Sequence, residues 1–192
     1  MGWMNVLSSL FLNGPTYKSG VEIRQMTSGA VKANIKVIPL SETDHQEITK
    51  PNAAELDWIA QNLASARELA KEFGTQGENE NLAPNILDEA FVGWLEQWDS
   101  TKEDPNPAIN AFGIAFGQSL VDTLGLHWAV VTDSQGTEIA VHGSPGDILI
   151  FPPNLIAKRF SKRQTGFMAP LFESIAADVE KVRKILKSKE KS

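Results

Sequence analysis

Apolar and polar residues alternate along residues 31–37, which read VKANIKV. A period of two is typical of a β-strand that buries one face. Residues 21–25 show a weaker form of the same pattern, and the turn-forming residues 27–29 separate the two segments. The pattern therefore predicts an N-terminal β-hairpin that ends at Pro39.

Longer segments place apolar residues at the i, i+3, i+4, i+7 spacing of an amphipathic helix. They are residues 52–73, 84–98, 108–124 and 166–186. Asn52 and Glu55 have the spacing of a capping box, and Gly74 stands where a C-terminal glycine is common. Pro84 suits the first helical position. Helical spacing at residues 3–11 predicts a further short helix.

The helix predicted at residues 108–124 is apolar on nearly every face as far as Gln118. A helix of this composition is expected near the middle of a domain. Gly113 and Gly117 lie one turn apart, and Asn110 shares their face. Each glycine costs on the order of 1 kcal/mol relative to alanine inside a helix. We therefore expect another part of the chain to pack closely against the two glycines.

The C-terminal half predicts a three-stranded meander of short strands. Its strands are residues 126–133, 137–142 and 147–151. Residues 134–136 and the Pro145-Gly146 pair supply the turns. After the rigid Pro152-Pro153 pair, we expect residues 154–160 to form a short strand or turn.

Together these elements predict an α+β fold. An antiparallel sheet, made of the N-terminal hairpin and the C-terminal meander, packs against about four helices. The 192 residues suffice for one core, since a chain of this length buries roughly 70% of its unfolded surface. We expect a single domain over residues 1–192, with flexible ends at 1–18 and 188–192.

The charge is distributed unevenly along the chain. The net charge is −6, yet residues 41–105 alone carry 15 acidic and four basic side chains. Acidic residues of the first two long helices lie off the apolar stripes and should face solvent: Glu68, Glu72, Asp88, Glu89, Glu96 and Asp99. Such a surface repels phosphate backbones and attracts basic proteins. We expect a basic protein partner and no nucleic acid.

The absence of cysteine excludes disulfides, thiolate metal sites and a cysteine nucleophile. The apolar residues 2–12 carry no signal-peptide features and are too few for a membrane span, which needs about 20 residues. We therefore expect a cytoplasmic protein without a membrane span. Gly113 to Gly117 lacks the third glycine and the preceding strand of a dinucleotide-binding loop. We expect no cofactor.

His127 and His142 would share one face of the first meander hairpin if its turn pairs Asp133 with Glu138. Two imidazoles can begin a zinc site, but a catalytic site needs a third protein ligand. In the same register, the carboxylates of Asp133 and Glu138 would face each other across the turn. A desolvated pair of this kind could perform acid–base chemistry. A solvated turn is the simpler interpretation of these carboxylates.

Polar residues beside apolar runs form the candidate binding site. Its members are Asn110, Gln118, Asp122, Trp128, Asn154, Lys158 and Arg159. If the glycine-bearing helix packs on the sheet, these side chains could converge at one end, with the tryptophan as an apolar wall. Such a group could bind an anion or a peptide. The alternative is a hydrogen-bonded staple between helix and loop, with two solvated cations.

Part of the chain resembles a protein family. The resemblance rests on residues 109–113, 117–120, 124–128, 151–152 and 157–160. These residues comprise a glycine-spaced helix, a tryptophan-bearing strand, and Phe-Pro followed by Lys-Arg. They resemble an uncharacterised bacterial family, a domain of unknown function, over about residues 55–179. The resemblance implies a bacterial cytosolic protein and draws interest to Lys158 and Arg159, but it transfers no catalytic role.

The sequence favours a non-enzymatic binding or interaction protein, such as a regulator or an immunity-type inhibitor, that presents its acidic helical face to a basic partner. The alternative is a small metal-independent hydrolase that uses carboxylates. A deep pocket joining Gln118, Asp122, Trp128 and Lys158 would favour the hydrolase, and an exposed acidic helix pair would favour the binding protein.

We predict that the purified protein carries no stoichiometric transition metal, because the chain has no cysteine and no evident third ligand beside His127 and His142. Elemental analysis of the purified chain measures this directly. About one zinc ion per chain would contradict the prediction.

Overall fold

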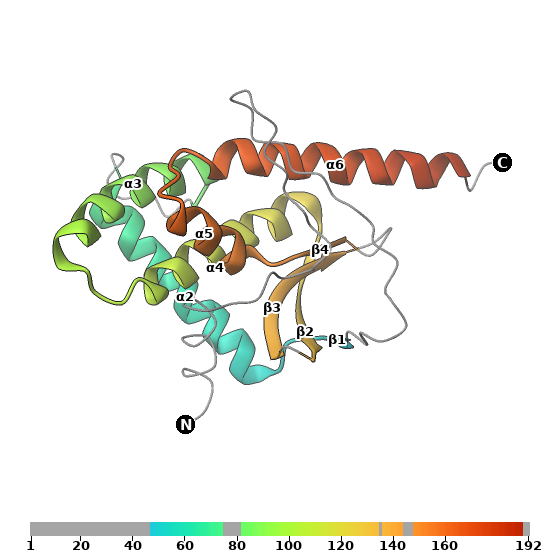
Figure 1. Cartoon of the computed structure of the whole chain (residues 1–192). Helices are drawn as coiled ribbons and strands as arrows, with labels where there is room; N and C mark the ends of the chain where they lie inside the picture. Colours follow the sequence, from blue (N-terminus) through green and yellow to red (C-terminus); the bar gives the residue numbers. More distant parts are fainter. Residues whose placement is uncertain (1–46, 75–81, 135, 144–147, 190–192) are drawn as a thin grey trace.

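The computed structural model describes residues 47–74, 82–134, 136–143 and 148–189. This part of the chain combines helices with one antiparallel sheet, which confirms the predicted α+β class (Figure 1). The elements are β1 (Glu47–Thr49), α2 (Ala53–Phe73), α3 (Pro84–Thr101), α4 (Asn106–Leu124), β2 (His127–Asp133), β3 (Gly136–Gly143), β4 (Ile148–Ile150), α5 (Pro152–Ser161) and α6 (Met168–Lys189). No described helix is both long and apolar enough to cross a membrane.

The four described strands have the order β1-β2-β3-β4 and are antiparallel throughout. The C-terminal meander predicted from the sequence is confirmed as β2, β3 and β4. The edge strand β1 was not predicted, and its residues are all exposed. The N-terminal hairpin and the short helix at 3–11 lie outside the described residues, so those two predictions are not tested.

Helix ends follow the predicted chemistry. The Asn52 side chain accepts a hydrogen bond from the Glu55 N–H at 3.0 Å, and the Glu55 carboxylate accepts one from the Asn52 N–H at 2.7 Å. This is the predicted capping box. Pro84 occupies the first turn of α3. Gly125 ends α4 with a φ of 63°, a conformation in which glycine carries no side-chain penalty.

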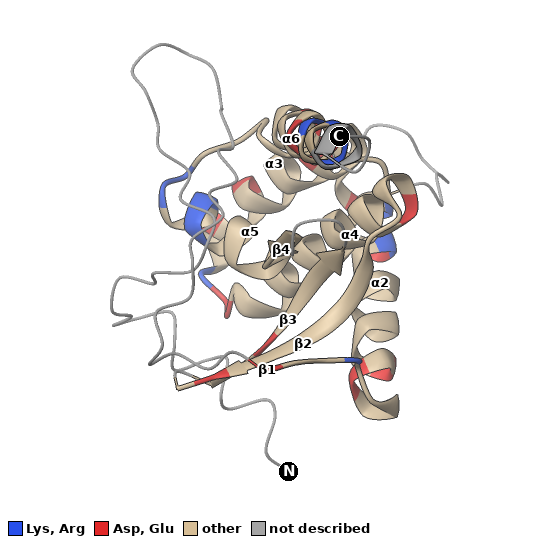
Figure 2. Ribbon diagram, turned by 90° about the vertical axis from the view of Figure 1, so that its right-hand side faces the viewer, with Lys and Arg blue, Asp and Glu red and all other residues tan. Residues whose placement is uncertain are grey.

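Helix α4 forms the middle of the fold, as its apolar composition predicts. Residues 111–117 are buried without interruption. Helices α2 and α5 both contact α4 and lie on opposite sides of it (Figure 2). Helix α6 contacts both α3 and α4. Phe91 packs edge-on against Phe112 and Phe167, so aromatic rings from α3, α4 and the start of α6 share one core.

The prediction of a short strand or turn at residues 154–160 is wrong, because these residues belong to helix α5. The Pro152-Pro153 pair begins the helix, at positions whose N–H groups have no partner within a helix. Leu155 and Ile156 are buried against the core. Packing of this short segment on α4 therefore decided its conformation, which local pattern did not reveal.

Gly113 and Gly117, called here the glycine seam, allow α5 and β2 to approach α4 closely. A Cβ atom on Gly113 would lie 2.5 Å from the Cα of Pro153. A Cβ on Gly117 would lie 2.8 Å from the Cγ of Pro152 and would collide with the ring of Trp128. The close approach expected from the two interior glycines is confirmed.

We predict that Gly113→Ala destabilises the protein by about 1–3 kcal/mol, because the added methyl group meets the backbone of Pro153 and overpacks the seam. The gain in helix propensity, about 1 kcal/mol, should not compensate. Chemical unfolding measures the change. The control Thr123→Ala lies at an exposed position of α4. A Gly113→Ala variant as stable as this control would contradict the close-packed seam.

Candidate functional site

Gln118, Asp122 and Trp128 lie together, as predicted for the candidate binding site. The indole N–H of Trp128 donates to the Gln118 side-chain oxygen at 2.9 Å. The Gln118 amide nitrogen donates to Asp122 at 2.8 Å. Both functional ends of the glutamine amide are thus engaged within the protein. This chain of hydrogen bonds ties β2 to α4, which favours the staple over a binding pocket at these three residues.

The other members of the candidate group do not join this chain. The Asn154 amide donates to both carboxylate oxygens of Glu138 at 3.1 Å, which fastens α5 to β3. Lys158 is exposed on α5, and Asn110 is half-buried on α4. The structure therefore distributes the predicted site residues over separate contacts.

Arg159 differs from every other predicted site residue, because its side chain is only 6% exposed. Its Nη1 donates to the Leu155 carbonyl at 3.1 Å, and its guanidinium lies 5.1 Å from the centre of the Phe167 ring. Its Nε has no hydrogen-bond partner within the described part of the chain. Burial lowers the pKa of Arg159 to about 10, so the side chain still carries its charge at neutral pH.

The predicted pairing of Asp133 with Glu138 is wrong. Asp133 pairs with Gly136, whose φ of 141° lets β3 begin directly after a tight turn. The two carboxylates are therefore diagonal neighbours rather than direct cross-strand partners. His127 and His142 do share one face as expected and are direct cross-strand partners, with Nε2 and Nδ1 3.2 Å apart. Among the described residues, no three potential metal ligands cluster.

Asp88 performs a role that the sequence analysis missed. Its carboxylate accepts hydrogen bonds from the backbone N–H groups of Met168 and Ala169, at 2.8 and 2.9 Å. The carboxylate thus caps the start of α6 from α3, where the helix dipole favours negative charge. Burial raises the pKa of Asp88, while these backbone hydrogen bonds oppose the rise. The expectation that Asp88 belongs to a solvent-facing acidic surface is wrong.

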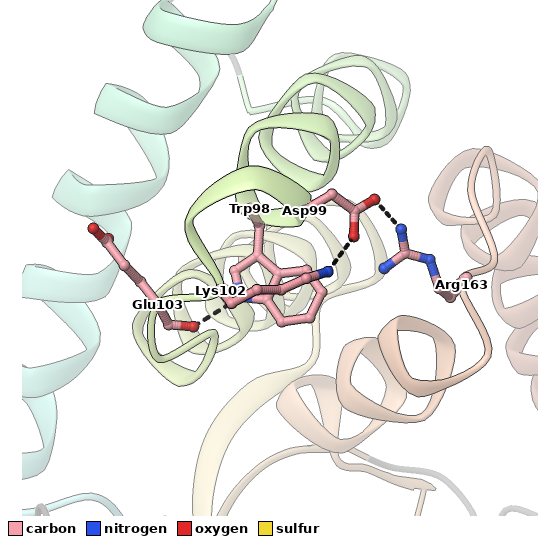
Figure 3. A network of polar contacts seen from close by, with 5 residues as sticks. All are labelled: Trp98, Asp99, Lys102, Glu103 and Arg163. Carbon is pink, nitrogen blue, oxygen red and sulfur yellow. Dashed lines mark hydrogen bonds and ion pairs between the residues drawn. The ribbon is translucent and has the colours of Figure 1, made fainter.

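Asp99 also has partners within the protein, in a cluster at the end of α3 (Figure 3). Its carboxylate accepts hydrogen bonds from Lys102 at 2.6 Å and from Arg163. Hydrogen bonds from Arg163 and then Lys102 are the main reasons why the pKa of Asp99 is lowered. The Lys102 ammonium lies 4.2 Å from the centre of the Trp98 ring, and the indole N–H of Trp98 donates to the Glu103 carbonyl at 2.8 Å.

These five residues, Trp98, Asp99, Lys102, Glu103 and Arg163, are called the Trp98 cluster. The cluster joins the end of α3 to the connection between α5 and α6. Lys102 and Arg163 have φ values of 52° and 53° and are the non-glycine residues with positive φ among those described. Both conformations cost energy for residues with a side chain. The ion pairs with Asp99 and the stacking on Trp98 offset part of this cost. No local signal in the sequence brings residues 99 and 163 together.

The chain thus contains an α+β domain built around a glycine-seamed helix, and known proteins match parts of it. Residues 94–172 match the family described as Domain of unknown function (DUF3806). This match confirms the predicted resemblance to a domain-of-unknown-function family. It extends from the second half of α3 to the first turn of α6 and includes Arg159 and the Trp98 cluster.

A crystal structure from Bacteroides thetaiotaomicron VPI-5482, solved at 1.50 Å resolution, has a similar fold, with a TM-score of 0.52 and 16% sequence identity. The similarity covers 68% of this chain and 47% of that chain. At this level of identity it concerns the fold alone. No curated protein matches the sequence significantly.

We predict that Asp88→Ala lowers the free energy of unfolding by about 0.5–2 kcal/mol, since α6 loses its side-chain cap. The folded state holds the Asp88 proton to a higher pH than the unfolded chain does. As the pH rises above 3.8, the free energy of unfolding of the parent therefore falls relative to that of Asp88→Ala. The difference in stability between the two proteins narrows.

Urea unfolding of both proteins at several pH values measures this difference. Glu96→Ala provides the control, because Glu96 is exposed on the same helix. Its effect should stay within about 0.5 kcal/mol. A difference between Asp88→Ala and the parent that widens with rising pH would mean that the backbone hydrogen bonds outweigh burial, and it would contradict the raised pKa of Asp88.

Proposed function

We propose that this protein is a non-enzymatic binding protein of the bacterial cytoplasm, a regulator or an immunity-type inhibitor, which receives a basic protein partner on an acidic surface. The acidic surface, as used here, consists of Glu68 and Glu72 on α2, Glu96 on α3, and Glu103 and Asp104 after α3. All five side chains are exposed.

The contact between the end of α2 and the middle of α3 carries this proposal. A Cβ atom on Gly93 would lie 3.1 Å from the Cβ of Phe73, so the two helices almost touch at this point. Glu72 precedes Phe73 directly, and Glu96 follows Gly93 by one turn. Close packing of the helices therefore puts exposed carboxylates of both elements on adjoining turns.

The electrostatics of this surface support attraction of a basic partner. In the described part of the chain, the salt bridges join Asp99 to Lys102 and Arg163, and Glu180 to Arg183. None of them includes a member of the acidic surface. Like charges on neighbouring turns repel one another, and a basic partner relieves this repulsion while the field steers its approach.

The alternative, a metal-independent hydrolase, receives less support from the carboxylates. Acid–base chemistry by a carboxylate pair needs two such groups close together and partly desolvated. Burial raises the pKa of Asp88, and both of its carboxylate oxygens already accept hydrogen bonds from backbone N–H groups of α6. Glu138 binds Asn154 and is not the direct cross-strand partner of Asp133.

We predict that reversing the charges of the acidic surface slows association with the partner. The parent chain is immobilised, its partner is captured from a bacterial lysate, and the association rate of the purified partner is measured against salt concentration. The rate should fall between 0.01 M and 0.15 M salt, as the Debye length shrinks from about 30 Å to about 8 Å. The double variant Glu72→Lys, Glu96→Lys should bind more slowly.

The double variant Glu47→Lys, Glu173→Lys provides the matched control, with the same change in net charge at exposed positions of β1 and α6. It should associate nearly as fast as the parent. An association rate that changes neither with salt nor in the Glu72→Lys, Glu96→Lys variant would overturn the proposal. So would equal slowing by both double variants, because the effect would then follow net charge rather than this surface.

A further inference from the structure

The last turn of α5 and the residues after it carry four cations within six positions: Lys158, Arg159, Lys162 and Arg163. The C-terminal end of a helix attracts cations through its free carbonyls and its dipole. This attraction explains Lys158 and Lys162, which are exposed, whereas the exposed Arg163 also pairs with Asp99. It does not explain why Arg159 is buried, since burial removes the water that stabilises its charge.

The hydrogen bonds of Arg159 leave one edge of its guanidinium without an acceptor. Nη1 is used by the Leu155 carbonyl. Nε, on the opposite edge, is buried and has no partner among the residues that the structure describes. The N–H of Nε and the adjacent N–H of Nη2 point in parallel, and this fork matches the two oxygens of a carboxylate or phosphate.

The carboxylates that contact the elements on either side of Arg159 have other partners. Asp99 binds Lys102 and Arg163, and Asp88 binds the first N–H groups of α6. The Phe167 ring offers a favourable face to Arg159, but a cation–π contact contributes only about 1–2 kcal/mol. A buried charge without an ionic partner is unusual in a folded protein.

We propose that the Nε edge of Arg159 anchors a binding site for a small oxyanion, a carboxylate or a phosphate. The oxyanion supplies the acceptors that the Nε edge lacks and the negative charge that balances the buried guanidinium. The exposed cations of the same turn, Lys158 and Lys162, raise the local anion concentration. This site is separate from the acidic surface and does not depend on the proposed protein partner.

Thermal unfolding of the full chain tests the site, with sodium phosphate and sodium acetate compared against sodium chloride at equal ionic strength. At ten times its Kd, the bound anion should raise the Tm of the parent by about 3–6 °C. Arg159→Met, which keeps the volume but not the charge, should lose this rise. Arg159→Lys, which keeps the charge but not the fork, should lose most of it.

Lys181→Met is the control, because Lys181 is an exposed cation of α6, and it should keep the full rise. In chloride alone, Arg159→Met should be as stable as the parent or more stable, since hydrophobic replacement of an uncompensated buried charge is often neutral or stabilising. Comparison of the phosphate and acetate arms shows which oxyanion the fork prefers.

Nitrogen-15 NMR of the parent provides a measurement that needs no variant. Titration with sodium phosphate or sodium acetate should shift the Arg159 Nε–H signal in a saturable way. Such a shift, together with a Tm rise that the Arg159 variants lose, supports the site. The proposal is overturned if neither anion gives a saturable shift, or if the Arg159 variants keep the rise.

Discussion

Close packing around α4 is the constraint on which the rest of the structure depends. Residues 111–117 are fully enclosed, and the glycine seam lets Pro152, Pro153 and Trp128 come nearer than any side chain would permit. Because α5 begins at this contact, the seam fixes where α5 lies and which of its residues turn inward. The burial of Arg159 follows from that position, and the absence of a side chain at Gly117 leaves room for the Trp128 ring that donates to Gln118.

Polar groups in and beside the core mostly serve to connect elements. Trp128 and Gln118 tie β2 to α4, Asn154 and Glu138 tie α5 to β3, and Asp88 caps α6. Buried polar groups usually have such partners, because leaving one unpaired costs about 1–3 kcal/mol. Arg159 departs from this rule on one edge of its guanidinium, and the proposed anion site rests on that departure.

The two proposed surfaces draw on different parts of the chain. Residues 94–172, which match the family of unknown function, include Arg159, the Trp98 cluster and the α3 side of the acidic surface. Helix α2, with Glu68 and Glu72, lies outside this match. An anion site would therefore belong to the matched segment, whereas the acidic surface combines that segment with a helix that precedes it.

The sequence by itself determined the elements whose signals are local: the amphipathic helices, the capping box at Asn52, the meander and the need for close approach at the glycine seam. These follow from residues a few positions apart, which interact in any fold that forms the element. Tertiary structure alone decided the helical state of α5, the register of the hairpin and the partners of Asp88, which lie 80 and 81 positions away. Whether a charge is buried, capped or solvated depends on segments brought together only by packing, and no local pattern encodes that outcome.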